Sequence, residues 1–531
     1  MNALISVYDK AGIEDFARSL SDLGWNIYAS GGTAQKLKEA GIKVTDVAEL
    51  VGGQAILGHR VVTLSREIHA GLLAQNTPED EAELKKLKIP RIDLVCVDMY
   101  PLKEIIAKLK ATGAEIIEMT DIGGPTLLRA AAKGRRIVIS KSEQRQEIID
   151  WLKAGKSNEV EFLRRLAAAA ELEVAKYVLE SAKYLNGKNL ASSIGELKAV
   201  PKYGENPWQT KAGLYEIDNS DSLAITNFKL QSGTQLSYNN YADIDRLLQT
   251  ITHIAAGFDK NYQITPMIAL GAKHGNVCGA GINGQPAEAT KKMLAGDPRA
   301  IFGGVVMLNF GLDKAAAQLL ISHDMGSGKR LLDVVVAPEV DKQALEILQR
   351  KAGKLRVVTN PALAHLNKSS LDQAPRFRYV RGGFLTQDNY IFMLDWDSQE
   401  LENHGEATTQ QEKDMLLAWA IGSTSNSNTI TLVKNGMLIG NGVGQQDRVS
   451  AAQLAIKRAH DARHKIEGAA AYSDSFFPFE DGPLELAKAG VEAILASRGS
   501  VQDEQVAKAL QKAGVAFYTL PDASARGFYA H

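Results

Sequence analysis

A lysine and a histidine stand side by side near the middle of the chain, at Lys273 and His274. The apolar run 267–270 before them predicts a buried strand, and the glycine-rich stretch 275–281 after them predicts irregular backbone. Histidine exchanges a proton near neutral pH, and an adjacent ammonium disfavours a second positive charge on the imidazole. The pair therefore indicates proton transfer. A histidine bonded to a backbone carbonyl beside a surface lysine is an equally favoured interpretation.

Three further polar clusters stand where predicted strands end or helices begin. They are Ser6–Lys10, Ser30-Gly31-Gly32-Thr33 and Asp121–Thr126. Backbone amides at a helix start, together with hydroxyl groups, suit a phosphate, although a capped turn explains each pattern alone. Because open α/β sheets bind ligands at the carboxyl ends of their strands, we expect the three clusters to meet at one sheet edge.

An α/β framework positions these motifs. Residues 1–141 alternate predicted strands (3–7, 26–29, 94–97, 137–139) with predicted helices (13–23, 31–37). Residues 142–195 are rich in Ala, Leu and Glu and predict a helical bridge. Residues 196–531 form a second α/β region with two blocks of predicted strands, 267–270, 305–308 and 334–336, then 429–433, 469–472 and 493–495. The similar size of the two blocks is compatible with an internal duplication, but no repeat of individual residues proves one.

Composition excludes several classes of protein. The 61 basic and 62 acidic residues nearly cancel, so no global field favours nucleic acid or an anionic membrane. Only Cys96 and Cys278 occur, far apart, which argues against a disulfide framework. The first residues lack the pattern of a signal peptide, and no apolar run reaches the roughly 20 residues of a membrane span. We therefore expect a cytoplasmic protein with small-molecule substrates.

Short motifs follow one another in a distinctive order. They are Ser-Val-Tyr-Asp-Lys (6–10), Ser-Gly-Gly-Thr (30–33), Asp-Met-Tyr-Pro (98–101), Asp-Ile-Gly-Gly-Pro-Thr-Leu-Leu-Arg-Ala-Ala-Ala-Lys (121–133), Lys-Tyr-Gly-Glu-Asn-Pro (202–207), Leu-Ser-Tyr-Asn-Asn (236–240), Lys-His-Gly-Asn-Val-Cys-Gly (273–279), Phe-Gly-Gly (302–304), Val-Val-Ala-Pro-Glu (335–339), Arg-Gly-Gly (381–383), Gly-Val-Gly-Gln-Gln-Asp-Arg (442–448) and Ser-Asp-Ser-Phe-Phe-Pro-Phe (473–479). Together they resemble the bifunctional purine-biosynthesis protein. That family joins an aminoimidazole-carboxamide ribonucleotide (AICAR) transformylase to an inosine monophosphate (IMP) cyclohydrolase.

The resemblance covers nearly the whole chain and implies an architecture. It implies an N-terminal α/β domain like methylglyoxal synthase, followed by two α/β units like cytidine deaminase. Such units often hold zinc, but the chain lacks a His-x-Glu with paired cysteines, so we predict no catalytic metal. The resemblance also implies 10-formyltetrahydrofolate as co-substrate, no covalently bound cofactor, and a homodimer with the transformylase site at the subunit interface.

For formyl transfer, the resemblance assigns proton transfer to His274, support of the developing charge to Lys273, and contact with the formyl carbonyl to Asn428. Without the family, Asn428 is better explained as a turn at a strand entry, and the phenylalanines below as core. The residues expected to bind substrate in this half are Lys202, Tyr203, Asn239, Gly303, Arg448, Asp474, Phe476, Phe477, Arg526 and Phe528.

For ring closure, the resemblance places Tyr100, Asp121 and Lys133 around the reacting atoms. The residues expected to bind the nucleotide in this half, mainly through its phosphate, are Ser6, Lys10, Ser30, Gly31, Gly32, Thr33 and Arg60. Enzymes of this kind mainly orient two groups that the substrate already carries.

Four departures from the family pattern leave alternatives open. Val62 replaces a lysine that would polarise the formyl group, Ser65-Arg66 replaces His-Pro, Asp98 replaces an asparagine, and Trp208 replaces a histidine. Either Arg60, Arg66 or His59 compensates for the lost lysine, or the protein is a formyltransferase whose N-terminal domain only binds a nucleotide or regulates. A binding scaffold without activity is a third interpretation, which rests on Trp208.

Overall fold

The computed structural model describes residues 1–531 except 59, 219 and 530–531. The chain divides into two compact units, Met1–Ile194 (unit 1) and Gly195–His531 (unit 2), each with its own buried apolar side chains. The segment expected as a bridge, residues 142–195, is helical through residue 189 and belongs to unit 1 up to Ile194. None of the described helices is both long and apolar enough to cross a bilayer.

Unit 1 is built on a parallel five-stranded sheet. Its strands are β1 (Asn2–Val7), β2 (Asn26–Ala29), β3 (Thr45–Asp46), β4 (Leu94–Asp98) and β5 (Ile137–Ile139), in the order β3-β2-β1-β4-β5. The four strands predicted in this unit are thereby confirmed. The chain leaves β1 toward β2 on one side and reaches β4 on the other, so a ligand crevice is expected at the carboxyl ends of β1 and β4.

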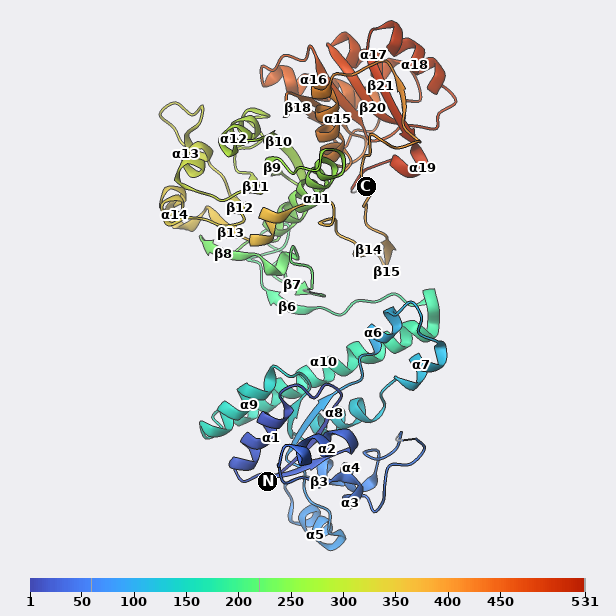
Figure 1. Ribbon diagram of the computed structural model, residues 1–531. Coiled ribbons are helices and arrows are strands. Elements are labelled where there is room, and N and C mark those ends of the chain that lie inside the picture. The colour runs from blue at the N-terminus through green and yellow to red at the C-terminus, as the bar shows by residue number, and fades with distance from the viewer. Residues whose placement is uncertain (59, 219, 530–531) are drawn as a thin grey trace. The chain divides into compact units, whose positions relative to one another are not determined.

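Helices cover this sheet (Figure 1). They are α1 (Ile13–Asp22), α2 (Gly31–Glu39), α3 (Val47–Leu50), α4 (Arg66–Leu73), α5 (Pro78–Leu87), α6 (Leu102–Ala107), α7 (Gly113–Glu118), α8 (Gly123–Lys133), α9 (Gln144–Lys153) and α10 (Glu159–Asn186), with a 3-10 turn at Gly187–Asn189. The long helix α10 packs along α8 and β5. Leu166, Ala170 and Val174 on α10 are buried in the unit 1 core, so this helix is part of the domain.

Unit 2 is built on a mixed twelve-stranded sheet. Its strands are β8 (Lys229–Ser232), β9 (Met267–Lys273), β10 (Asn276–Asn283), β11 (Val305–Leu308), β12 (Val334–Ala337), β13 (Arg356–Thr359), β16 (Glu402–His404), β17 (Ile430–Lys434), β18 (Met437–Gly442), β19 (Ala469–Ser473), β20 (Val491–Arg498) and β21 (Ala516–Pro521). Two small antiparallel pairs accompany it, β6 (Glu196–Ala199) with β7 (Leu214–Glu216), and β14 (Arg376–Val380) with β15 (Gly383–Gln387).

Helices flank the large sheet as well. They are α11 (Tyr238–Tyr262), α12 (Pro286–Ala295), α13 (Lys314–Ser322), α14 (Lys342–Leu348), α15 (Thr409–Gly422), α16 (Arg448–Asp461), α17 (Asp481–Lys488), α18 (Asp503–Lys512) and α19 (Asp522–Ala525), with 3-10 turns at Ile225–Asn227, Lys351–Gly353 and Pro361–His365. The helices α11 and α15 pack against each other (Figure 1). They share one core whose largest fully buried side chain is Trp419.

The large sheet repeats one pattern twice. Its strand order is β16-β21-β20-β19-β17-β18-β10-β9-β11-β12-β13-β8, so each strand of one half has a counterpart in the other. Each half has an antiparallel edge strand, a helix, a hairpin, and then strands alternating with helices. We call β8–β13 with α11–α14 the first half and β16–β21 with α15–α18 the second half. The halves meet where β10 pairs with β18.

The glycine-rich stretch after His274 forms most of strand β10, with a β-bulge between Val277 and Gly279, so the irregular backbone expected from sequence is confined to the turn and this bulge. The strand β9 turns directly into β10, which contains Gly279 and Gly281. A Cβ atom on either glycine would lie 2.2 Å from a carbonyl oxygen of α12. These glycines let a helix pack closely on the sheet, and Gly440 and Gly442 on β18 do the same beneath α16.

Candidate active sites

The carboxyl edge of the unit 1 sheet gathers the first two polar clusters. The hydroxyl oxygens of Ser6 and Ser30 lie 2.9 Å apart, and the Thr33 hydroxyl donates to the carbonyl of Val7 at 3.2 Å. The Lys10 side chain lies over the start of α2, since a Cβ on Gly32 would be 3.5 Å from its Cε. The residues expected to hold phosphate therefore lie together, with an ammonium beside the amino end of a helix.

Tyr100 and Asp121 meet at the same edge of the sheet. The Oδ1 atom of Asp121 accepts the Gly124 N–H at 2.8 Å, just before α8. Burial raises the pKa of Asp121, and the N–H groups of Gly124 and Tyr100 oppose this shift. Burial, with the nearby Asp121 carboxylate, also raises the pKa of Tyr100, whose ring lies 5.5 Å from that of Tyr8. A carboxylate and a phenol thus face one crevice.

Sequence reasoning did not predict two contacts at this edge of the sheet. The hydroxyl of Tyr177, on α10, accepts the Asp121 N–H at 2.6 Å, and burial raises its pKa to about 12. The sequence around Tyr177 gave no sign of a functional role, because this tyrosine lies in a long Ala-rich helix and in none of the motifs. The Oδ2 atom of Asp98 accepts the Asp9 N–H at 2.7 Å. An asparagine oxygen accepts the same bond, so this contact does not require the carboxylate.

Four further residues of unit 1 bear on the expectations from sequence. Lys133 is the last residue of α8, about 15 Å along the helix axis from the end beside Asp121, and its expected role in ring closure stays a prediction. The Arg60 guanidinium bonds Glu118, with Nη2 2.6 Å from Oε2. Val62 packs against the core of unit 1. His59 lies outside the described residues.

In unit 2, His274 stands in the two-residue turn between β9 and β10. It has a φ of 54°, in the left-handed region. The Nζ of Lys273 donates to the carbonyl of Phe302 at 2.7 Å, directly before Gly303. The N–H of Gly275 donates to Oδ1 of Asp243 on α11 at 2.7 Å. The lysine and the histidine are therefore held by contacts on both sides of the turn.

Arg246 links this turn to the segment that carries Asn428. Its guanidinium donates to the carbonyl of Thr424 at 3.1 Å and to Oδ1 of Asn426 at 2.7 Å. A Cβ on Gly275 would lie 3.6 Å from Arg246 Cγ, so the arginine touches the His274 turn as well. The Nδ2 of Asn428 donates to the carbonyl of Gln445 at 2.9 Å. Sequence reasoning missed Arg246, which lies in no motif.

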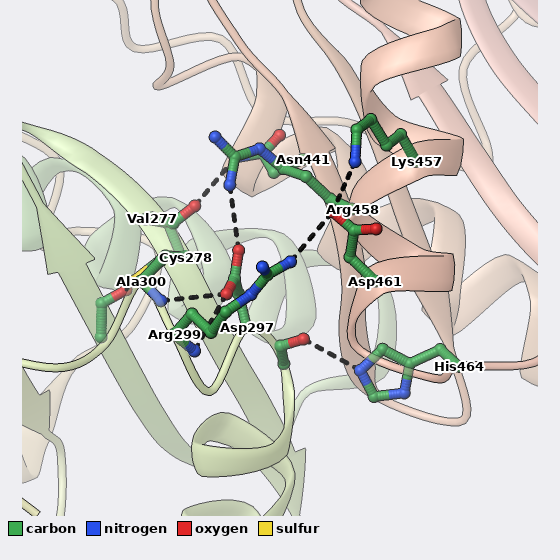
Figure 2. Close-up of polar contacts among 12 residues, drawn as sticks. Val277, Cys278, Asp297, Arg299, Ala300, Asn441, Lys457, Arg458, Asp461 and His464 are labelled. Atoms are coloured by element: carbon green, nitrogen blue, oxygen red, sulfur yellow. Dashed lines mark hydrogen bonds and ion pairs between the residues drawn. The ribbon is translucent and has the colours of Figure 1, made fainter.

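A cavity of about 200 Å³ opens beside Lys273 and His274, where β10 meets β18. Figure 2 shows its polar wall, in which Arg458 of α16 bonds Asp297 at 3.0 Å. Burial raises the pKa of Cys278 in this wall to about 12, so its thiol stays protonated at neutral pH. Pockets for whole nucleotides exceed about 300 Å³, so this cavity is at most part of a substrate site.

A further ion pair joins the halves at this place. Arg299 bonds Asp461 at 2.9 Å, and Lys457 bonds the same carboxylate at 2.7 Å from within α16. The Nε2 of His464 lies 2.9 Å from the carbonyl of Gly296. The loop before β11 is thereby fastened to α16, which fixes the wall of the cavity.

A second polar group lies at the end of β19. The carboxylate of Asp474 is buried, beside the Ser427 hydroxyl and within the field of Arg448 and Arg526. These two arginines lie 6.0 and 5.7 Å from the ring of Phe476, and Arg526 also bonds Asp522 at 2.9 Å. Phe477 is only 2% exposed and packs in the core, so the expectation that it walls a ligand is wrong.

The remaining expected residues lie at the surface. Lys202 is exposed and Tyr203 half-buried, beside a tight turn that carries Trp208, which is 78% exposed. The Nδ2 of Asn239 donates to the carbonyl of Glu205 at 3.2 Å, which fastens this motif to the start of α11. Phe528 is half-buried. No cluster of three His, Cys, Asp or Glu side chains that could hold a metal occurs in the described part of the chain.

These features define a two-unit α/β protein with polar side chains gathered at the carboxyl edge of the unit 1 sheet and a Lys-His pair beside a cavity in unit 2. A family model described as "AICARFT/IMPCHase bienzyme" matches residues 131–458, and an "MGS-like domain" model matches residues 12–126. The chain belongs to the AICARFT/IMPCHase bienzyme family. It is accordingly a bifunctional enzyme of purine biosynthesis.

The curated relatives agree with this assignment over nearly their whole length. Proteins named "Bifunctional purine biosynthesis protein PurH" are 34% identical in Persephonella marina, 35% in Bacillus thuringiensis and 37% in Anoxybacillus flavithermus, with 97% of each chain covered. A solved structure titled "Crystal structure of ForH" matches 36% of this chain and all of its own, at 34% identity and a TM-score of 0.33.

Proposed function

We propose that the His274 turn carries the formyl-transfer step of this enzyme, with 10-formyltetrahydrofolate as donor. The observation that supports this most is the fixed Lys273-His274 pair at the end of β9, beside a cavity. The 5-amine of AICAR attacks the formyl carbon, a C–N bond forms, and the bond from that carbon to N10 of the folate breaks. The amine loses one proton and N10 gains one.

His274 accepts the amine proton, since the amine's lone pair is delocalised and needs a base. The Lys273 ammonium, beside the carbonyl of Phe302, supports the negative charge that develops on the formyl oxygen. Asn428 donates to the same oxygen. The buried carboxylate of Asp474 accepts N–H groups of a bound substrate, and Arg448 and Arg526 bind phosphate or carboxylate groups.

Unit 1 closes the ring of the formylated product. The group Ser30-Gly31-Gly32-Thr33, with Ser6 and Lys10, holds the phosphate. The carboxamide nitrogen attacks the formyl carbon and forms a C–N bond, while Asp121 takes one proton from that nitrogen. The former 5-amine nitrogen then loses its proton, a C=N bond forms, the C–O bond breaks, and the oxygen, to which Tyr100 donates, leaves with two protons as water. The meeting of Tyr100 and Asp121 in one crevice supports these roles.

A second candidate function is formyl transfer alone, with unit 1 as a nucleotide-binding or regulatory domain. Val62 favours it, because this apolar side chain packs on the core and supplies no charge, while Arg60 is bonded by Glu118. One assay separates the two functions. AICAR and 10-formyltetrahydrofolate are supplied, and the formylated intermediate and IMP are measured separately. IMP formation supports both activities, and intermediate that accumulates without IMP contradicts ring closure.

We also propose that the enzyme is a cytoplasmic homodimer and that each half of unit 2 is a cytidine-deaminase-like unit. The arm β14–β15 supports self-association, since it carries exposed Phe377, Tyr379 and Leu385, and an isolated two-stranded hairpin is barely stable in water. Sedimentation equilibrium tests the dimer. A monomer at micromolar concentration contradicts it.

A further inference from the structure

The repeated halves of unit 2 place two equivalent turns in one sheet. The turn between β9 and β10 contains His274 and Gly275, with φ of 54° and 73°. The turn between β17 and β18 contains Asn435 and Gly436, with φ of 51° and 70°. Two positive φ values define the type I′ hairpin turn, for which Asn-Gly is a favoured sequence. The second half thus carries the same turn without the histidine.

The lysine before each turn makes the same contact. The Nζ of Lys273 donates to the carbonyl of Phe302 before β11, and that of Lys434 donates to the carbonyl of Glu467 before β19. Lys434 makes this contact although no histidine follows it, so the contact stabilises the turn whether or not a histidine is present. Lys273 therefore stabilises its turn in addition to any part in the chemistry.

An aspartate holds each turn from the helix that precedes it. Asp243 and Asp414 are both the sixth residue of their helices, α11 and α15. Asp243 accepts the Gly275 N–H at 2.7 Å. Asp414 accepts the N–H groups of Gly436 at 2.6 Å and of Asn435 at 2.7 Å. The carboxylate is thus a repeated part of the turn.

The two aspartates differ in what else they touch. Both oxygens of Asp414 are bonded to the turn, and Gln410 bonds it as well. In the described part of the chain, Asp243 bonds the turn through Oδ1 alone. The turn that contains His274 therefore depends on one carboxylate contact, to the N–H that follows the histidine, whereas the turn of the second half has two.

We propose that Asp243 is a positioning residue for formyl transfer, which holds the Gly275 amide so that the His274 ring meets the substrate amine. This inference rests on the proposed function of His274. Loss of the Asp243 acceptor lets the turn relax by a fraction of an ångström to an ångström. A displacement of that size lowers turnover by about 100-fold.

Three variants test it in the full-length enzyme. Asp243→Ala is expected to lower kcat of formyl transfer about 100-fold and change KM for AICAR less than about threefold. Asp243→Asn is expected to recover most of kcat, because the amide oxygen still accepts the Gly275 N–H. Asp414→Ala is the matched control. It is expected to lower the unfolding temperature by about 5 °C while kcat stays within about twofold at a temperature where the variant is folded.

The outcomes separate this inference from the proposed function. If the wild type formylates AICAR and Asp243→Ala keeps its kcat, or if both alanine variants lose kcat equally while folded, Asp243 does not position His274. If Asp243→Asn is as slow as Asp243→Ala, a positioning hydrogen bond is also contradicted. Absence of formyl transfer in the wild type itself contradicts the proposed function instead.

Discussion

The guanidinium of Arg246 donates a hydrogen bond to Oδ1 of Asn426 at 2.7 Å, which joins the helix behind the His274 turn to the segment before β17. The same arginine lies against Gly275 and, at 4.6 Å, over the ring of Tyr529. One side chain of the first half therefore touches the turn with the proton acceptor and the segment with Asn428. The two parts of the proposed formyl-transfer site depend on each other through it.

Replacing Arg246 by lysine should uncouple these parts. A lysine keeps the charge but lacks the planar fork of donors that the guanidinium directs at Thr424 and Asn426. We expect kcat of formyl transfer to fall about tenfold, with a smaller change in KM for AICAR, as measured by steady-state kinetics. Arg376→Lys is the control, because Arg376 covers Tyr529 at 3.6 Å but does not bond Asn426. An equal loss in the control would assign the effect to Tyr529.

Ring closure should depend on pH through Asp121. Burial raises the pKa of this carboxyl, and it acts as a base only when ionised. The rate of IMP formation from the formylated intermediate should therefore fall as pH decreases through that raised value, above the ordinary range of an aspartate. We expect Asp121→Asn to lose at least about 100-fold in rate and to abolish this acidic limb. If Asp121→Asn kept the wild-type pH profile, the role of Asp121 as the base of ring closure would be contradicted.

Replacing Asp474 should stabilise the fold and harm binding. Burial raises the pKa of Asp474, so its contribution to stability is lost as pH rises through the folded value, and the ionised form is costly at neutral pH. We expect Asp474→Asn to raise the unfolding temperature by about 2 °C at pH 7.5, less at pH 5, and to weaken substrate binding. Thermal unfolding at both pH values and binding calorimetry measure this. A lower unfolding temperature of Asp474→Asn at pH 7.5 would contradict this prediction, and would mean that the ionised Asp474 stabilises the fold by its attraction to Arg448 and Arg526.

A lysine at position 62 should restore the charge that the family pattern places there. Val62 is only partly buried on the core of unit 1, so a lysine can keep its ammonium in water. We expect Val62→Lys to speed ring closure at least about tenfold if no other cation already polarises the formyl group. Val62→Met is the uncharged control. Equal rates for wild type and Val62→Lys would indicate that Arg60 or another residue compensates.

The sequence predicted the elements better than their contacts. Strands such as Met267–Leu270 and Val305–Leu308 were correct because a buried strand is an uninterrupted apolar run. The stretch after His274 was predicted as a loop because it is rich in glycine. Glycine also occurs where a helix packs closely on a strand, and the packing at Gly279 shows that this is its role here.

Some site residues could be brought together from the sequence, and others could not. Ser6, Ser30 and Thr33 could be brought together from sequence, since the ends of parallel strands share an edge. The position of Lys133 at the end of α8 follows from its spacing in the motif, and its role in ring closure stays a prediction. Asp243 and Arg246 could not be found, because long-range contacts of a buried helix leave no local signal. The duplication became visible only in the strand order.

The measurement that tests the central claim most directly is formyl transfer by His274→Asn. Asn-Gly suits a type I′ turn and stands in the equivalent turn at Asn435, so this variant should fold with an unfolding temperature at least equal to that of the wild type. The account predicts that kcat falls by at least about 100-fold while AICAR still binds. Unchanged turnover in the folded variant would contradict proton transfer by His274.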